Sequence, residues 1–123
     1  MRKLGAIVLL ATGFAVGMVA SAEAHHSLSA FDYTTEITLE GTVTKFLFGN
    51  PHTFIHIAVK GEDGETVEWA AEMSSVQNMA RRGIRGSTFK VGDMVTLSMN
   101  PLKSGSPGGK YTSVIAADGK AYQ

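Results

Sequence analysis

The start of the chain constrains the fold most, because it has the parts of an export signal and so defines what remains to fold. Arg2 and Lys3 precede an apolar run over residues 4–20, which ends in two overlapping small-residue sites, Ala20-Ser21-Ala22 and Ala22-Glu23-Ala24. Residues 1–24 are therefore predicted to be a secretory signal peptide, and the mature protein to be periplasmic or secreted. The apolar run is short and contains three glycines, so we expect no stable membrane anchor after cleavage.

What the signal leaves behind is enough for one small domain. Removing residues 1–24 from the 123-residue chain leaves 99 residues. No cysteine is present, which excludes disulfides, thiolate metal sites and thiol catalysis. The chain has eleven basic and eleven acidic residues, and the signal contains two of the basic ones and one of the acidic ones. The mature part therefore has nine basic and ten acidic residues. A net charge of −1 gives no general attraction to nucleic acid, and we expect no nucleic-acid partner.

Hydrophobic periodicity predicts a mainly β domain. Alternating apolar and polar residues indicate strands at 36–48, 53–60, 65–73, 94–99 and 111–116, separated by turns rich in Gly, Asn, Asp and Pro. Gly41 inside the first strand predicts a bulge or sharp bend. Trp69 shares a strand face with Val67 and Ala71 and is predicted to be a core residue. Residues 100–110 are predicted to be a flexible loop, and the chain after Gly119 a short polar tail.

A short helix is predicted between the third and fourth strands. Ser74 or Ser75 caps its start, an apolar stripe with Val76 and Met79 recurs at helical spacing, and Gly83 ends it. Three strands, a helix and two strands are the order of the small five-stranded Greek-key barrel called the OB-fold. We therefore predict a signal peptide at 1–24, an N-terminal arm at 25–35 and an OB-like β-barrel at 36–123. An open sandwich of the same strands is the alternative.

The predicted cleavage site suggests a metal site at the mature amino terminus. Cutting after Ala24 leaves the free amine on His25, followed directly by His26, so that the amine and the imidazole of one residue can bind one ion. Cutting after Ala22 places His25 third, where the amine, two backbone amides and the imidazole form a square-planar set. Both sets are rich in nitrogen, which suits Cu(II) or Ni(II). The alternative is that the histidine pair is only a polar start to the mature chain.

The remaining histidines, His52 and His56, lie on the predicted second strand. Four residues of a strand span about 13 Å, so these two side chains share a face but cannot bind a single ion together. Either one could meet the amino-terminal arm. His52, beside the Gly49-Asn50-Pro51 turn, is the better candidate for a third nitrogen ligand, and His56 the weaker one because a histidine deeper in a strand is more often structural.

No residue pattern indicates acid–base or nucleophilic catalysis. Ser74 and Ser75 are explained by helix capping, and Glu68 and Glu72 are too far apart along a strand to act directly as a glycosidase pair. One arrangement is an exception. An amino-terminal histidine completed by a second imidazole is the copper site of enzymes that cleave polysaccharides oxidatively, so a small enzyme with such a histidine brace is a further alternative.

Several short motifs in order resemble a known family. They are Ala24-His25-His26-Ser27, Leu39-Glu40-Gly41-Thr42-Val43, Asn50-Pro51-His52, Glu68-Trp69-Ala70 followed by Glu72, Arg81-Arg82-Gly83 and Val91-Gly92-Asp93. Over essentially the whole mature chain they are similar to the small exported bacterial proteins grouped as a domain of unknown function, DUF6152. The resemblance implies a periplasmic OB-like barrel and no established activity. The family pattern has one aromatic residue after the Asn-Pro-His motif and another after the Arg-Arg-Gly motif. This chain has Phe54 after the first motif but Ile84 after the second.

Together these observations predict a periplasmic binding module that is not an enzyme. Its most concrete ligand is copper, held by His25 and His26 with His52 as a further ligand and His56 as a weaker one. The alternatives are a metal-independent barrel that binds a small ligand or a periplasmic protein, and the copper-dependent oxidative enzyme. The physiological ligand and the oligomeric state are not predicted.

Overall fold

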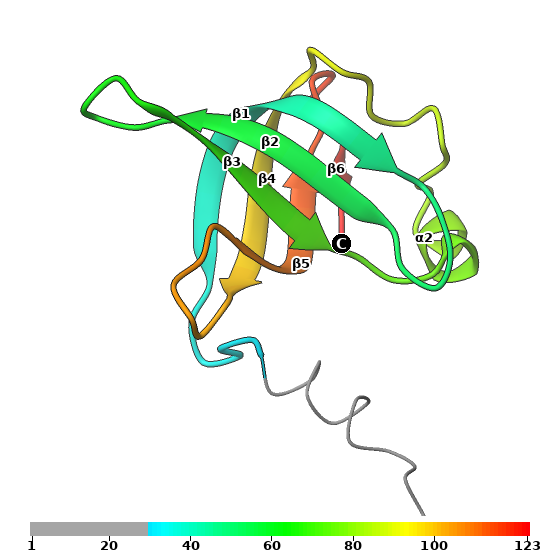
Figure 1. The fold of residues 1–123 in the computed structure, drawn as a ribbon. Helices are drawn as coiled ribbons and strands as arrows, with labels where there is room; N and C mark the ends of the chain where they lie inside the picture. The colour runs from blue at the N-terminus through cyan, green and yellow to red at the C-terminus, as the bar shows by residue number, and fades with distance from the viewer. Residues whose placement is uncertain (1–29) are drawn as a thin grey trace, which may run out of the picture.

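In the computed structural model, which describes residues 30–123, the chain forms a β-barrel with one short helix (Figure 1). The predicted signal peptide and the candidate ligands His25 and His26 lie outside the described residues. The elements in chain order are β1 (Ile37–Leu47), β2 (Phe54–Lys60), β3 (Thr66–Glu72), α2 (Val76–Arg81), β4 (Met94–Pro101), β5 (Gly108–Ile115) and β6 (Ala121–Tyr122). The predicted mainly β class, and the position of the helix between the third and fourth strands, are confirmed.

The barrel closes in the strand order that defines an OB-type topology. Strand β1 pairs antiparallel with both β2 and β4, β2 pairs with β3, and β4 pairs with β5. Closure comes from β3 and β5, which pair in parallel through Ala70 with Gly108, Ala71 with Gly109, and Glu72 with Lys110. The five strands therefore form a ring in which each strand has two partners, and the barrel has no free strand edge where β3 meets β5.

The closing strand begins inside the segment that the sequence predicted to be a flexible loop. Gly108 and Gly109 are buried strand residues, and only the segment between Pro101 and Gly108 connects β4 to β5. A Cβ on Gly108 would lie 2.8 Å from the carbonyl oxygen of Ala70, and a Cβ on Gly109 would overlap the carbonyl oxygen of Asn100. The two glycines are there because neighbouring backbones approach closely, so the prediction of a loop over the whole of residues 100–110 was wrong.

The core fills the barrel and extends under the helix. Fully buried side chains come from the inward faces of the strands, with Met79 from α2 and Ile84 from the segment after it. The predicted polar tail also contributes, because Tyr122 on β6 is buried and its ring lies 5.7 Å, centroid to centroid, from that of Phe89. Ile84, which directly follows Arg82-Gly83, is one of the fully buried residues.

Two details of the strands differ from the predictions. The register between β1 and β2 shifts between Val43 and Lys45, so the bulge lies at Thr44 rather than at Gly41. Gly41 is needed for a different reason, since a Cβ there would lie 2.7 Å from the carbonyl oxygen of Ala58. Trp69 faces inward as predicted but is only half-buried, because the β2–β3 hairpin projects past the barrel toward its turn (Figure 1).

No helix within residues 30–123 is long and apolar enough to cross a membrane.

Candidate functional site

The position of His52 is set by the turn between β1 and β2. Asn50, which precedes a cis proline, accepts a hydrogen bond at Oδ1 from the backbone N–H of Val76 in the first turn of α2, at 3.0 Å. The buried Thr53 donates its N–H to the carbonyl oxygen of Ser74 and accepts one from the N–H of Met73, at 2.8 and 2.7 Å. His52 lies between these two anchored residues, so its backbone is held on both sides.

The imidazole of His52 is paired with a carboxylate on β3. Its Nδ1 lies 2.6 Å from Oε1 of Glu72, and the side chains are 43% and 17% exposed. The Nζ of Lys110, on the closing strand β5, lies 3.9 Å from the same oxygen and donates to the carbonyl oxygen of Met73 at 3.4 Å. A carboxylate beside Nδ1 favours the tautomer with the proton on that nitrogen. Nε2 is then the ring nitrogen that is left for a ligand.

His56, four residues further along the chain and on β2, has a similar but longer contact with a glutamate. Its Nδ1 lies 3.5 Å from Oε1 of Glu68, and its side chain is 22% exposed. The same oxygen accepts a hydrogen bond from the hydroxyl of Thr44 at 2.7 Å. Since Glu68 is already engaged by Thr44 and the imidazole is more buried, His56 is the less accessible of the two histidines.

The hairpin register explains why both histidines face glutamates. In the β2–β3 ladder His56 lies opposite Ala70 and Phe54 opposite Glu72, so each histidine lies diagonally across from a glutamate on the outer face. The sequence patterns point to Glu72 only as one half of a glycosidase pair with Glu68, and they do not predict its contact with His52. The turn at Gly61–Gly64 sets this register, so the pairing could have been read from the sequence by counting outward from that turn. Lys110 could not have been found this way, because it comes from a distant strand.

Within residues 30–123, no three His, Asp or Glu side chains gather closely enough to hold a metal ion. His52 with Glu72 and His56 with Glu68 are separate pairs. A metal at His52 would therefore draw its other ligands from outside this part of the chain. His25 and His26, which we predict to be those ligands, lie outside it.

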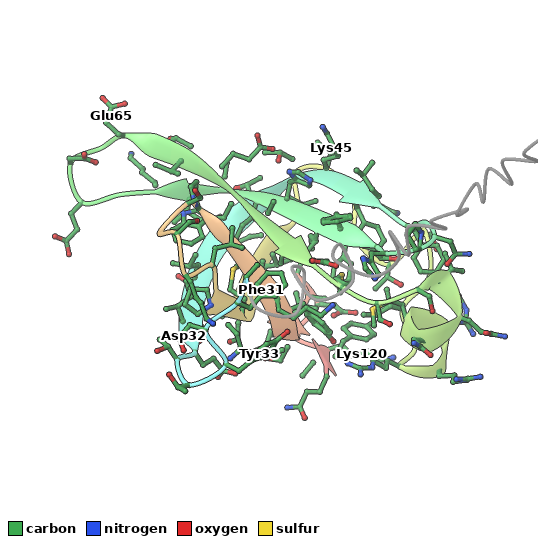
Figure 2. The ribbon with its side chains drawn as sticks, turned by 60° about the horizontal axis from the view of Figure 1, so that its bottom comes forward. Phe31, Asp32, Tyr33, Lys45, Glu65 and Lys120 are labelled. Carbon is green, nitrogen blue, oxygen red and sulfur yellow. The ribbon has the colours of Figure 1, made fainter. Side chains whose placement is uncertain are left out.

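An apolar hollow lies beside the His52–Glu72 pair. We call it the seam hollow, because it lies over the junction of β3 and β5; its volume is about 190 Å³ and its lining residues are Phe31, Phe54, Ala70, Glu72, Leu102, Pro107, Gly108 and Gly109. Phe31 is buried and pairs with Leu102 through an isolated β-bridge. Figure 2 shows Phe31, Asp32 and Tyr33 together where the described chain begins. The start of the described chain therefore forms one wall of the hollow.

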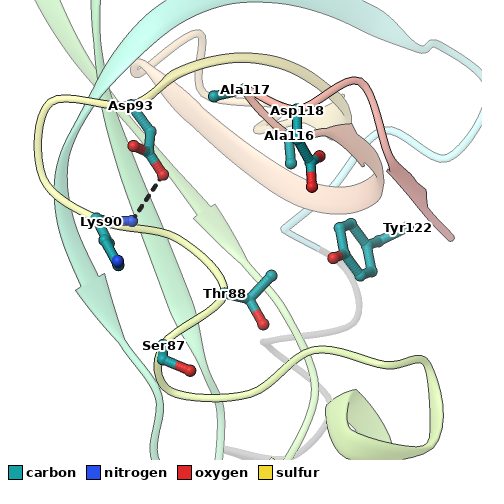
Figure 3. A pocket seen from close by; sticks show the side chains of 8 residues that line it. All are labelled: Ser87, Thr88, Lys90, Asp93, Ala116, Ala117, Asp118 and Tyr122. Carbon is teal, nitrogen blue, oxygen red and sulfur yellow. Dashed lines mark hydrogen bonds between the residues drawn. The ribbon is translucent and has the colours of Figure 1, made fainter.

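A second hollow, of about 240 Å³, is polar and has a structural explanation (Figure 3). It lies between the loop before β4 and the turn before β6. Its carboxylates are used in these turns, since Asp93 accepts from the N–H of Lys90 at 3.0 Å and Asp118 from the N–H of Lys120 at 2.9 Å. These contacts assign the two carboxylates to loop structure.

Two pKa shifts in the described chain lie away from the His52–Glu72 pair. Hydrogen bonds from Thr34 and Thr35 lower the pKa of the Asp32 carboxyl. Burial raises the pKa of the Tyr111 hydroxyl, so this phenol stays protonated at neutral pH.

The prediction that Ser74 or Ser75 caps the helix is confirmed, because Ser75 accepts a hydrogen bond from the N–H of Asn78 at 3.3 Å.

The comparisons with known proteins support the fold but assign no activity. Residues 14–111 match the family described as "Family of unknown function (DUF6152)". No curated protein matches the sequence. Among solved structures, the mitochondrial single-stranded DNA binding protein Rim1 of S. cerevisiae is similar, with a TM-score of 0.51, 11% identity, and coverage of 67% of this chain and 92% of that chain. At this identity the likeness shows a shared barrel fold.

Proposed function

Since the chain belongs to the DUF6152 family, whose description names no activity, we propose from its own residues that it is an exported binding module for a copper ion. The ion would be held by the mature amino terminus, through the amine and imidazole of His25 with His26 beside them, and by the imidazole of His52. The protein would act in the periplasm or outside the cell, as carrier or store of the ion.

The observation that carries this proposal is the 2.6 Å contact between Nδ1 of His52 and Oε1 of Glu72. Histidines that bind metals commonly have their second ring nitrogen held by a carboxylate, which fixes the tautomer and raises the basicity of the ligating nitrogen. His52 is also substantially exposed and has an anchored backbone. It therefore has the properties expected of a third nitrogen ligand for Cu(II).

The predicted terminal ligands are within reach of His52. Phe31 and Glu72 line the same hollow, so the chain preceding Phe31 starts beside the pair. His25 lies six positions before Phe31, and six steps of extended chain span up to about 20 Å. That reach is enough to bring the amino terminus to Nε2 of His52.

A metal-independent binding module is the second candidate, and the seam hollow favours it. In OB-folds the face of strands two and three, together with the loop between strands four and five, is where oligonucleotides and oligosaccharides bind. The seam hollow occupies this place, with Phe54 from β2 and Leu102 from the loop after β4. Glu68 and Glu72 on the same face disfavour the phosphate backbone of a nucleic acid, so a small apolar ligand fits this alternative better.

A copper titration of purified protein that begins at His25, confirmed by sequencing its terminus, tests the proposal. We expect one Cu(II) ion per chain. An added residue before His25 should abolish the amine–imidazole pair, His52→Ala should weaken binding, and Glu72→Gln should weaken it about 10- to 100-fold by removing the charge behind the ligand. Binding should also weaken on acidification, since the amine and imidazole have ordinary pKa values of about 7.7–8.0 and about 6.5 and must lose their protons.

The second histidine pair supplies matched controls. His56→Ala and Glu68→Gln change the same residue types in a neighbouring pair, and we expect them to leave copper affinity nearly unchanged. Equal affinity in the processed and extended chains, together with no effect of His52→Ala, would refute the copper site. Peroxide-dependent turnover by the copper-loaded protein would instead move it to the class of oxidative enzymes.

A further inference from the structure

The seam hollow is shaped to receive a side chain from outside the barrel. Its lining is almost entirely apolar, with Glu72 as its charged member. Ala70, Gly108 and Gly109 contribute to the lining with little or no side chain, so a group that enters can come close to the backbone of β3 and β5. A volume of about 190 Å³ is suited to one aliphatic side chain rather than to a large ligand. Open apolar recesses of this kind gain free energy when they are filled.

The chain enters the described part of the structure at the rim of this hollow. The backbone N–H of Lys103 donates to the carbonyl oxygen of Ala30 at 2.9 Å, and the N–H of Asp32 donates to the carbonyl oxygen of Pro101 at 2.8 Å. These bonds fix residues 30–32 along the end of β4 and place Phe31 in the wall of the hollow. Whatever directly precedes Ala30 therefore starts next to the apolar lining.

The preceding segment contains a side chain of the right kind. Residues 25–29 are His-His-Ser-Leu-Ser, so Leu28 is the large aliphatic residue of the segment and has a serine on each side. Leu28 lies three positions before Phe31, a reach of about 10 Å in extended chain. The chain bends at Ala30, so the alternation of an extended strand does not continue from Phe31 into this segment, and reach and apolar character are what single out Leu28.

We infer that Leu28 docks into the seam hollow and thereby holds the amino-terminal arm against the barrel beside His52. The docking itself does not depend on the cleavage site or on a metal. Its consequence for copper rests on the proposed function: from a docked Leu28, His25 is three residues away, again about 10 Å in reach, and Glu72 both lines the hollow and pairs with His52. The hollow would thus position the terminal ligands before the ion arrives.

Methyl NMR of the metal-free protein that begins at His25 tests the docking. We expect the Leu28 methyl groups to be shifted by the rings of Phe31 and Phe54 and to show nuclear Overhauser contacts with their protons. Ala70→Leu, which fills the hollow from the barrel side, should abolish these contacts while the barrel stays folded. Leu28→Ser should shift the amide signals of Gly108 and Gly109, whereas Ser27→Ala, the matched control, should not.

Leu28 methyl groups with random-coil shifts and no ring contacts, in a protein whose barrel signals are native, would overturn the inference. Contacts that appear only at high protein concentration would assign the hollow to a second copy of the chain and would overturn the inference as well.

The effect of docking on copper binding is measured in a separate experiment. If Leu28 docks, Leu28→Ser should weaken Cu(II) binding roughly tenfold, because the arm must then be ordered on binding. Docking without copper affinity would refute only the proposed function, and copper affinity without docking only this inference.

Discussion

Replacing Gly109 by alanine should destabilise the pairing of β5 with β4. Its Cβ would overlap the carbonyl oxygen of Asn100 and would lie 2.9 Å from Cγ and Sδ of Met99. The methionine side chain can move, but the carbonyl belongs to β4 and is fixed by the β4–β5 ladder. Overpacking in a well-packed region costs about 1–3 kcal/mol, and a clash with backbone belongs at the upper end of that range. We expect a loss of about 3 kcal/mol in the free energy of unfolding.

Thermal and urea unfolding, followed by circular dichroism, measure this loss. A change of 1 kcal/mol shifts Tm by about 4–8 °C in a domain of this size, so Gly109→Ala should lower Tm by about 12–24 °C. Gly49→Ala is the matched control, because a Cβ at Gly49 meets nothing within 4 Å. Its effect should stay within about 0.5 kcal/mol.

Near-native stability of Gly109→Ala would refute the reasoning. It would mean that the segment around Gly109 can move away from β4 at little cost, as the flexible loop predicted from the sequence would. Loss of stability in both variants would instead show that the protein is sensitive to any glycine replacement. Only a large loss at Gly109 with none at Gly49 supports the close approach of the β4 and β5 backbones at this glycine.

Three further predictions follow from the fold. Trp69→Ala should cost less than the ~3–5 kcal/mol of a fully buried tryptophan, because the ring is half-buried, and denaturant unfolding measures the difference. Trypsin should cut the folded protein first after the exposed Lys103 rather than in residues 108–110, and mass spectrometry of the fragments identifies the site. The hydroxyls of Thr34 and Thr35 lower the pKa of Asp32, so its stabilising effect should be present above the carboxyl's unfolded pKa and disappear as the pH falls through the lower folded value. Carboxyl NMR titration of the native protein should show this lowered pKa, and Asp32→Asn should reduce the acid dependence of unfolding.

Much of the fold could be predicted because it is encoded locally. The alternation in residues 36–48, the Gly-rich turn at 61–64 and the serine caps before Val76 each act over a few residues, and each produced the expected element. The wrong predictions arose where a residue's environment comes from far along the chain. Gly108 and Gly109 look like loop residues until β3 is brought against them, and Tyr122 looks like part of a polar tail until Phe89 packs on it.

The candidate site also combines features that local sequence indicates with features that only long-range contacts decide. The sequence by itself indicated that His52 and His56 are too far apart to bind a single ion, because extended-chain geometry sets the distance between residues four apart, although the structure begins β2 at Phe54 and leaves His52 just before it. Only the tertiary structure decided that Glu72 lies against Nδ1 of His52, that Lys110 reaches the same carboxylate, and that Phe31 joins Leu102 to form a hollow beside them. These contacts join residues from the turn before β2, from β3, from β5 and the loop before it, and from the start of the described chain. They exist because the barrel closes, and closure depends on long-range strand pairing that no local pattern specifies.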